Sequence, residues 1–190
     1  MTKVIGQNIV LRAYREADIP AMYKWNQDKD TTQWMGPRFR QPRSLEDISA
    51  SVHSIMDKPP ADGAFFVIAE RSSEAYLGGI DLTSIDLVDR NAVVSLVVAT
   101  LALRNRGIGR AALGLLMDFA FTRLKLHKLE LGVNANNHAA IACYQKLGFT
   151  VEGIIRDHSF IDGSYSDLYR MGIVETEYVA YPGISYESIR

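Results

Sequence analysis

The spacing of hydrophobic and polar residues changes along this chain, and each change indicates a different element. A mostly apolar run from Val4 to Leu11 predicts a strand, and an amphipathic helix is expected from about Asp18 to Asn26. Residues 31–43 mix Trp, Gly, Pro and Arg, a composition typical of a loop. A second helix is predicted to open at Ser44, because Asp47 three residues later completes a capping-box pattern.

The remaining pattern is a strand meander that gives way to alternating helices and strands. Strands are expected at Ala64–Ala69, Tyr76–Leu82, Ala92–Ala99, Lys128–Val133, Thr150–Ile155 and Ser166–Val174, with helices at about Gly107–Leu126 and Asn137–Leu147. Asp162-Gly163, between the last two strands, is a strong hairpin signal. This order indicates an α/β (α+β) fold with a mixed, largely antiparallel sheet flanked by helices.

Composition narrows the classes of protein. The 190 residues are 47% hydrophobic, and 21 Lys+Arg against 22 Asp+Glu leave a net charge of −1, which gives no reason to expect nucleic-acid binding. Cys143 is the one cysteine, so an internal disulfide is ruled out, and the histidines show no metal-ligand spacing. The N-terminal segment MTKVIGQNIVLR has no long apolar stretch. We therefore expect a cytoplasmic protein of one domain over 1–190, with a core at about 8–175, a tail at 176–190, no metal and no membrane contact.

The most informative segment joins a predicted buried strand to a predicted helix. It consists of Arg104, Asn105, Arg106, Gly107, Ile108, Gly109 and Arg110. The first turn of a helix presents backbone N–H groups without intrahelical partners, and its dipole favours an anion there. Glycine lets the anion approach these groups, and arginine donors can fork onto a phosphate. The segment is therefore predicted to bind a pyrophosphate, the alternative being an ordinary turn with solvated arginines.

A dinucleotide would be another ligand for such a segment. Gly107-x-Gly109-x-x-Ala112 satisfies the loose dinucleotide fingerprint. However, the next predicted strand runs into Asn134, where a ribose-binding acid would be expected, and too little chain follows for a doubly wound sheet. A dinucleotide-dependent oxidoreductase is therefore the weaker interpretation.

Three motifs in order resemble the GNAT superfamily of N-acetyltransferases. The first is Arg104-x-x-Gly107-x-Gly109, similar to the family's phosphate motif, and the second is the run Asn137 to Phe149, NHAAIACYQKLGF. The third is the ending from Glu152 to Met171, which is similar to the branch that contains ribosomal-protein N-terminal acetyltransferases and spermidine acetyltransferases. The likeness runs from about residue 8 to 175.

The resemblance implies a fold, a cofactor and roles for particular residues. The sheet would splay after its fourth strand, where Val97, Val98 and Ala99 would align the pantetheine arm of acetyl-CoA, with an N–H near Val98 polarising the thioester carbonyl. Asn137 would hold the cofactor, or serve only as a helix N-cap. Tyr144 would give a proton to the departing thiol, a task that suits a phenol, although it could instead only pack. Cys143 is then core filler, since direct transfer needs no acyl-enzyme.

The sequence does not single out one residue as the general base, and it indicates the acceptor only in part. Asp81, Glu130, Asp157, His158 and ordered water are all candidates for the base. Arg38, Arg40 and Arg43 in the 31–43 loop favour a protein N-terminus or an amino-acid-like amine over spermidine, unless they are simply solvated.

The expected function is acetyl transfer from acetyl-CoA to a primary amine, by direct attack in a ternary complex. The enzyme would act as a monomer or homodimer. A non-catalytic acyl-CoA-binding module remains the main alternative, and the tail could extend the sheet or contact a second subunit.

Overall fold

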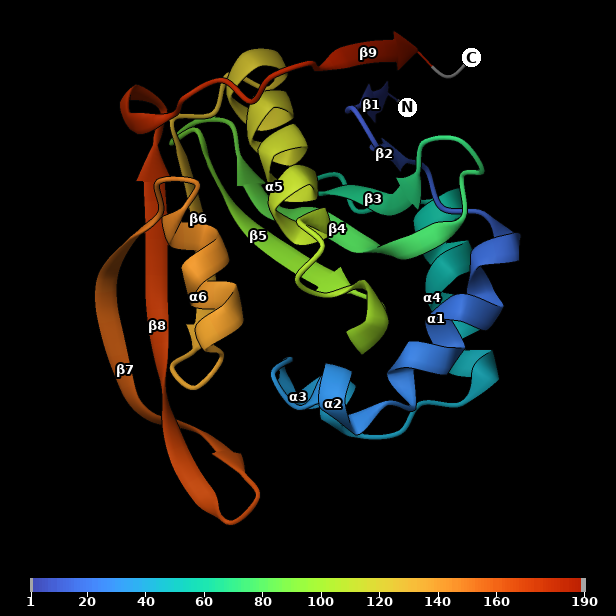
Figure 1. The fold of residues 1–190 in the computed structure, drawn as a ribbon, viewed down its shortest axis with the longest axis vertical. Coiled ribbons are helices and arrows are strands. Elements are labelled where there is room, and N and C mark those ends of the chain that lie inside the picture. The colour runs from blue at the N-terminus through green and yellow to red at the C-terminus, as the bar shows by residue number, and fades with distance from the viewer. Residues whose placement is uncertain (1, 189–190) are drawn as a thin grey trace.

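The computed structural model describes residues 2–188, and within them the strands form one nine-stranded sheet (Figure 1). The strands are β1 (Thr2–Ile5), β2 (Ile9–Arg12), β3 (Ala64–Glu70), β4 (Tyr76–Asp86), β5 (Asn91–Val98), β6 (Lys128–Asn134), β7 (Thr150–Ile161), β8 (Ser164–Val174) and β9 (Ser185–Ser188). Their order is β7-β8-β6-β5-β4-β3-β2-β1-β9. The β5–β6 pair is parallel and the other pairs are antiparallel, which confirms the mixed, largely antiparallel sheet.

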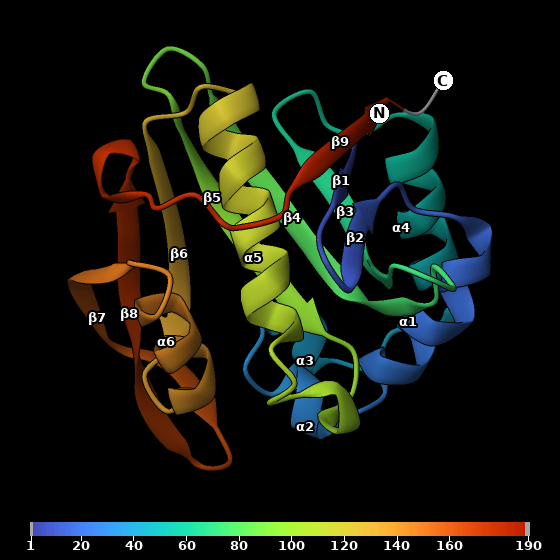
Figure 2. The same cartoon turned by 45° about the horizontal axis from the view of Figure 1, so that its top comes forward.

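Helices cover both faces of this sheet. They are α1 (Ile19–Asn26), α2 (Lys29–Thr32), α3 (Pro37–Arg40), α4 (Leu45–Asp57), α5 (Ile108–Asp118) and α6 (His138–Gln145). Figure 2 shows α5 and α6 on one face, where the larger hydrophobic core lies, and α1 and α4 beside the other half of the sheet. A second, smaller core on the α4 face includes Val10, Val52 and Val67. None of the helices in residues 2–188 has the length and apolar character that crossing a membrane requires.

Several predicted elements differ from the structure; for example, the strand expected at Thr150–Ile155 continues to Ile161. The strand expected from Val4 to Leu11 is a hairpin instead, because the Gly6 N–H donates to the Ile9 carbonyl oxygen at 2.9 Å and turns the chain. The loop expected at 31–43 contains the end of α2 and all of α3. The helix expected to reach Leu126 ends its α-helical hydrogen bonding at Asp118 and continues as one π-helical turn. By contrast, the capping box of Ser44 and Asp47 is confirmed at the start of α4.

The parallel pair in the middle of the sheet is very short. β5 and β6 pair only over Asn91–Val93 and Lys128–Glu130. Beyond that point β5 continues along β4 as far as Val98, and β6 continues along β8 as far as Asn134, so the two strands part. This split confirms the splay that the family resemblance predicted at the end of the strand carrying Val97 and Val98, which is β5 in the structure.

The C-terminal tail adds a strand to the β1 edge of the sheet. β9 pairs with β1, so the tail extends the sheet edge. On its way it crosses α5, where the Tyr178 and Tyr186 hydroxyls both donate to the Asp118 carboxylate. The Tyr181 ring packs so closely on Gly114 that no side chain would fit there. These contacts attach the tail to the face of the sheet that carries α5.

Candidate active site

The segment before α5 presents unpaired backbone donors. Asn105 and Gly107 adopt left-handed conformations, with φ of +59° and +78°. The first helical hydrogen bond is donated by Ala111 to the Gly107 carbonyl, at 2.9 Å. Within the described residues, the N–H groups from Asn105 to Arg110 donate to no backbone acceptor. This arrangement fits an anionic group such as a diphosphate, since both the free donors and the helix dipole favour negative charge there.

The three arginines of this segment have different surroundings. Arg104 Nη2 donates to the Asp30 carbonyl at 3.3 Å and to Thr31 Oγ1 at 3.1 Å, so it ties the segment to α2. Arg106 and Arg110 are exposed and make no ion pair with another described residue. Two of the three predicted cations are therefore free to meet an anion from solution.

The start of α5 lies over the end of β5. A Cβ built on Gly109 would meet Leu96 Cδ2 and Val98 Cγ2 at 3.7 Å, so these side chains face the helix. The Ala99 N–H donates to the Leu77 carbonyl of β4 at 2.9 Å. Because successive N–H groups of a strand point to opposite sides, the Val98 N–H points the other way, into the split. The backbone N–H and C=O groups of Val97 and Ala99 point toward β4. Of the three residues, Val98 is therefore the one whose backbone groups point into the split.

Helix α6 lies on the same face of the sheet. Asn137 is its N-cap, and the Asn137 side chain accepts the Ala140 N–H at 3.3 Å. Tyr144, in the same helix, is buried against Phe149 with ring centroids 6.1 Å apart. Burial raises the pKa of the Tyr144 phenol well above its ordinary value. Its hydroxyl makes no hydrogen bond to another described residue, so it stays protonated and free to donate.

Cys143 precedes this tyrosine and is half-buried. Burial raises the pKa of the thiol, outweighing the effect of Arg110 and Lys146. The thiolate is therefore disfavoured, which agrees with a packing role.

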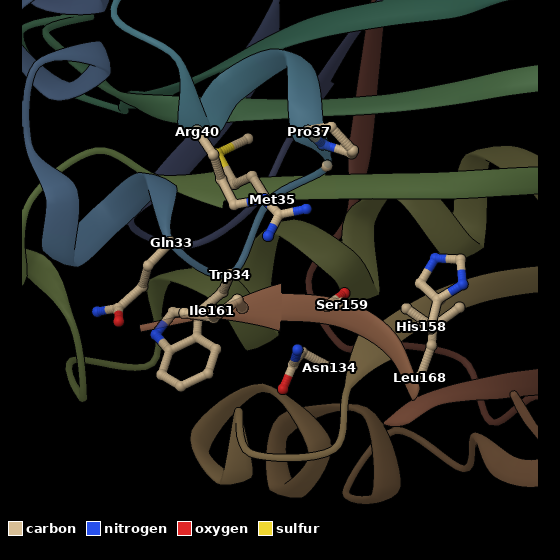
Figure 3. A pocket seen from close by; sticks show the side chains of 12 residues that line it. Gln33, Trp34, Met35, Pro37, Arg40, Asn134, His158, Ser159, Ile161 and Leu168 are labelled. Atoms are coloured by element: carbon tan, nitrogen blue, oxygen red, sulfur yellow. The ribbon is translucent and has the colours of Figure 1, made fainter. Parts of the chain in front are cut away.

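A cavity of about 200 Å³ lies on the opposite face of the sheet (Figure 3). It is lined by Gln33, Trp34, Met35, Gly36, Pro37 and Arg40 from the α2–α3 segment, Gly132 and Asn134 from β6, and His158, Ser159, Ile161 and Leu168 from the β7–β8 hairpin. Leu131 and Val133 point instead into the core with α6. The cavity thus touches β6 where that strand has parted from β5.

An irregularity in β7 places His158 at this cavity. The register of β7 against β8 shifts between Ile155 and Ser159, and Asp157 has a φ of +51°. The Asp157 N–H donates to Asp167 Oδ1 at 3.0 Å, which anchors the irregular turn. Such bulges commonly change the direction of a side chain.

The candidates for the general base are dispersed. His158 lines the cavity, whereas Glu130 forms an ion pair with Lys128 at 2.9 Å. Asp81 lies partly buried on β4 and accepts the Phe66 N–H at 3.3 Å. Burial raises the pKa of Asp81 to about 7, although hydrogen bonds from Phe66 and Tyr14 oppose the shift. Of these carboxylates, neither lines the cavity.

Sequence analysis placed Trp34, Met35 and Arg40 in the predicted 31–43 loop, but it did not identify the residues that face them across the cavity. That wall consists of Gly132, Asn134, Ser159, Ile161 and Leu168. No local motif marks these residues, because the cavity forms only when distant segments meet.

Comparison with known proteins agrees with this architecture. Residues 8–150 match a family described as an acetyltransferase (GNAT) domain. Spermidine N(1)-acetyltransferase of Vibrio cholerae serotype O1 is 26% identical over 175 residues, which cover 92% of this chain and 98% of the relative. The Escherichia coli K12 protein of the same name is 38% identical over 103 residues, or 54% of this chain and 55% of the relative.

A putative ribosomal N-acetyltransferase of Bacillus subtilis, YdaF, is 29% identical over 101 residues, which cover 53% of this chain and 55% of the relative. Among solved structures, spermidine N-acetyltransferase from Vibrio cholerae in complex with CoA and spermine has a TM-score of 0.79 at 24% identity. That likeness covers 90% of this chain and 98% of the other.

Proposed function

Because this chain belongs to the GNAT acetyltransferase family, we propose that its split sheet aligns acetyl-CoA from the α5 side with an amine that enters from the cavity side. The chain is an acetyl-CoA-dependent N-acetyltransferase, and the amine attacks directly within a ternary complex. The non-catalytic and oxidoreductase interpretations are not favoured by its relatives. The observation that carries the proposal is the parting of β5 and β6 between the α5 segment and the cavity.

The residues of the α5 segment fit the diphosphate of the donor. The free N–H groups of Asn105 to Arg110 would bind its oxygens, and Arg106 and Arg110 would add charge-assisted hydrogen bonds. Arg104 would shape the segment through its contacts with α2 rather than bind directly. Asn137 would keep the start of α6 in place beside the donor.

Acetyl-CoA, when bound, supplies the acetyl group as an activated thioester. The Val98 N–H would donate to the carbonyl oxygen as negative charge develops on it, a contribution of a few kcal/mol in acyl-transfer enzymes. The Tyr144 hydroxyl would give its proton to the sulfur that departs as the new C–N bond forms. Because burial keeps this phenol protonated, the proton is available at neutral pH.

The acceptor is a small primary amine, and the relatives that act on spermidine support this class. Its ammonium group must lose a proton before attack, since an alkyl ammonium has a pKa of about 10.4. His158 is the candidate base that lines the cavity, and we place the proton there.

A screen of primary amines with acetyl-CoA tests the proposal by free-thiol release. We expect thiol release that depends on an amine, and an acetylated amine in equal amount. Thermal stabilisation by acetyl-CoA but not by NAD provides the control, because a ligand that binds only the folded state raises its apparent stability. Stabilisation by acetyl-CoA without release for any amine would instead indicate a non-catalytic module.

A further inference from the structure

We propose that the cavity selects amines that carry a carboxylate close to the nitrogen, as in a free amino acid, over polyamines. This inference rests on the proposed function, since it describes the acceptor of the same reaction. It follows from the charges around the cavity and from an unpaired donor on Arg40.

The cavity wall contains no acidic side chain. Among its lining residues the titratable ones are Arg40 and His158, which carry positive charge or none. A polyamine brings several ammonium groups, and each would enter beside a guanidinium without a carboxylate to pair with. A carboxylate would instead find an opposite charge.

Arg40 is held with part of its guanidinium group unused. Its Nη1 donates to the Phe160 carbonyl oxygen at 3.0 Å, which fixes the head group between α3 and β7. Its Nε is buried and has no hydrogen-bond partner among the described residues. Figure 3 shows the guanidinium extending from α3 toward the cavity. Its Nη2 donates to no other described residue and is not fully buried, so it can meet a carboxylate in the cavity with a charge-assisted hydrogen bond.

Asp162, which lines the space next to the cavity, is already paired. Asp162, at the tip of the β7–β8 hairpin, accepts from Lys29 Nζ at 2.7 Å across the opening. This ion pair raises the pKa of Lys29, so the lysine remains charged. Asp162 and Lys29 balance one another, and the positive charge of Arg40 remains uncompensated at the cavity.

The Asn134 side chain of the wall is satisfied internally. The Asn134 amide donates to Ser166 Oγ at 2.7 Å, and its oxygen accepts the Asn136 N–H at 2.9 Å. Trp34, Ile161 and Leu168 supply apolar surface beside these polar groups. The space of about 200 Å³ adjoins a second one of about 360 Å³ that shares Gln33, Pro37, Arg40 and Ile161, so charge rather than size distinguishes the acceptors.

Paired acceptors test the inference directly. Free amino acids are each compared with the amine that loss of the carboxylate would give, and spermidine is included, with kcat/KM measured by thiol release. We expect the carboxylate-bearing member of the preferred pair to react at least tenfold better, and spermidine to react poorly. Arg40→Gln should abolish the difference within the pair, and Arg40→Glu should reverse it in favour of the decarboxylated amine and spermidine.

Arg38→Glu is the matched control. Arg38 lies in the same helix, is exposed and contacts Ser51 rather than the cavity, so the net charge changes equally while the ranking of acceptors should not. Arg40→Lys should recover part of the preference, and the KM for acetyl-CoA should stay constant in all variants. A general distortion of the fold would instead raise that KM.

The outcomes separate the two proposals. If the wild type prefers spermidine or the decarboxylated amines, the inference is overturned while acetyl transfer stands. An equal change of the ranking in Arg38→Glu and Arg40→Glu would also overturn it, because the effect would then be one of net charge. If no amine releases thiol although acetyl-CoA binds, both proposals fail.

Discussion

The two sides of the split sheet are built in different ways. On the α5 side, the proposed donor site comes from three short continuous segments, residues 97–99, 104–110 and 137–144, and relies mainly on backbone groups. On the opposite side, the cavity is assembled from residues 33–40, 132–134 and 158–168, and its character depends on side chains. A donor that is always the same suits a backbone site, whereas an acceptor that differs between enzymes suits a wall of exchangeable side chains.

One contact joins the two sides. Arg104 leaves the segment before α5 and binds the Asp30 carbonyl and the Thr31 hydroxyl of α2. The donor segment and the α2–α3 wall are therefore positioned together. Changes on the donor side should affect all acceptors equally, while changes in the cavity should alter their ranking.

The largest effect is expected from Tyr144→Phe. Loss of the hydroxyl removes the proposed proton donor, and we expect kcat to fall about 100-fold with every acceptor, the order seen for general acid catalysis. The affinity for acetyl-CoA, measured by calorimetry, should be nearly unchanged. Tyr165→Phe, at an exposed tyrosine, is the control and should retain full activity. Unaltered turnover of Tyr144→Phe in a chemistry-limited assay would refute the acid role.

A smaller effect, again common to all acceptors, is expected from Arg110→Glu. Loss of a charge-assisted contact and reversal of the charge should raise the KM for acetyl-CoA about tenfold, with the acceptor ranking preserved. Lys24→Glu, on the exposed side of α1, changes the net charge equally and should leave this KM unaltered. A variant that changed the acceptor ranking but not this KM would contradict the separation of the two sides.

The smallest effect concerns stability on the acceptor face. Burial raises the pKa of Asp81 to about 7, so between about pH 4 and pH 7 the folded chain keeps a proton that the unfolded chain releases. The contribution of this group to stability therefore decreases as the pH rises through that window.

Asp81→Asn should remove the decrease. A full shift to about 7 would be worth roughly 3 kcal/mol between pH 4.5 and pH 8, and because the side chain keeps some contact with solvent we expect the variant to gain about 1 kcal/mol relative to the wild type. Urea unfolding at both pH values measures this gain. Asp57→Asn, at an exposed position of α4, should show no comparable change. An equal difference between variant and wild type at both pH values would contradict a buried, proton-retaining carboxyl.

Several features were predictable because the forces that produce them are local. The start of α4 follows from the exchange of hydrogen bonds between Ser44 and Asp47, and the last hairpin follows from the positive φ angles that Asp162-Gly163 provides. The anion site before α5 was expected for the same reason, since glycines and a helix start are adjacent in the chain. Resemblance to a family supplied the roles of Val98, Asn137 and Tyr144, which remain predictions.

The sequence by itself thus determined most elements, the α/β class and the donor-side segment, because short-range hydrogen bonds and side-chain spacing specify them. Only the tertiary structure determined the cavity, the position of His158 in its wall and the pairing of β9 with β1. It also determined that Arg104 binds α2 while Arg106 and Arg110 are exposed. The Asp157 turn, for example, depends on a carboxylate ten residues away on the neighbouring strand. Contacts of this kind come from the pairing of distant segments, whose register no local pattern encodes.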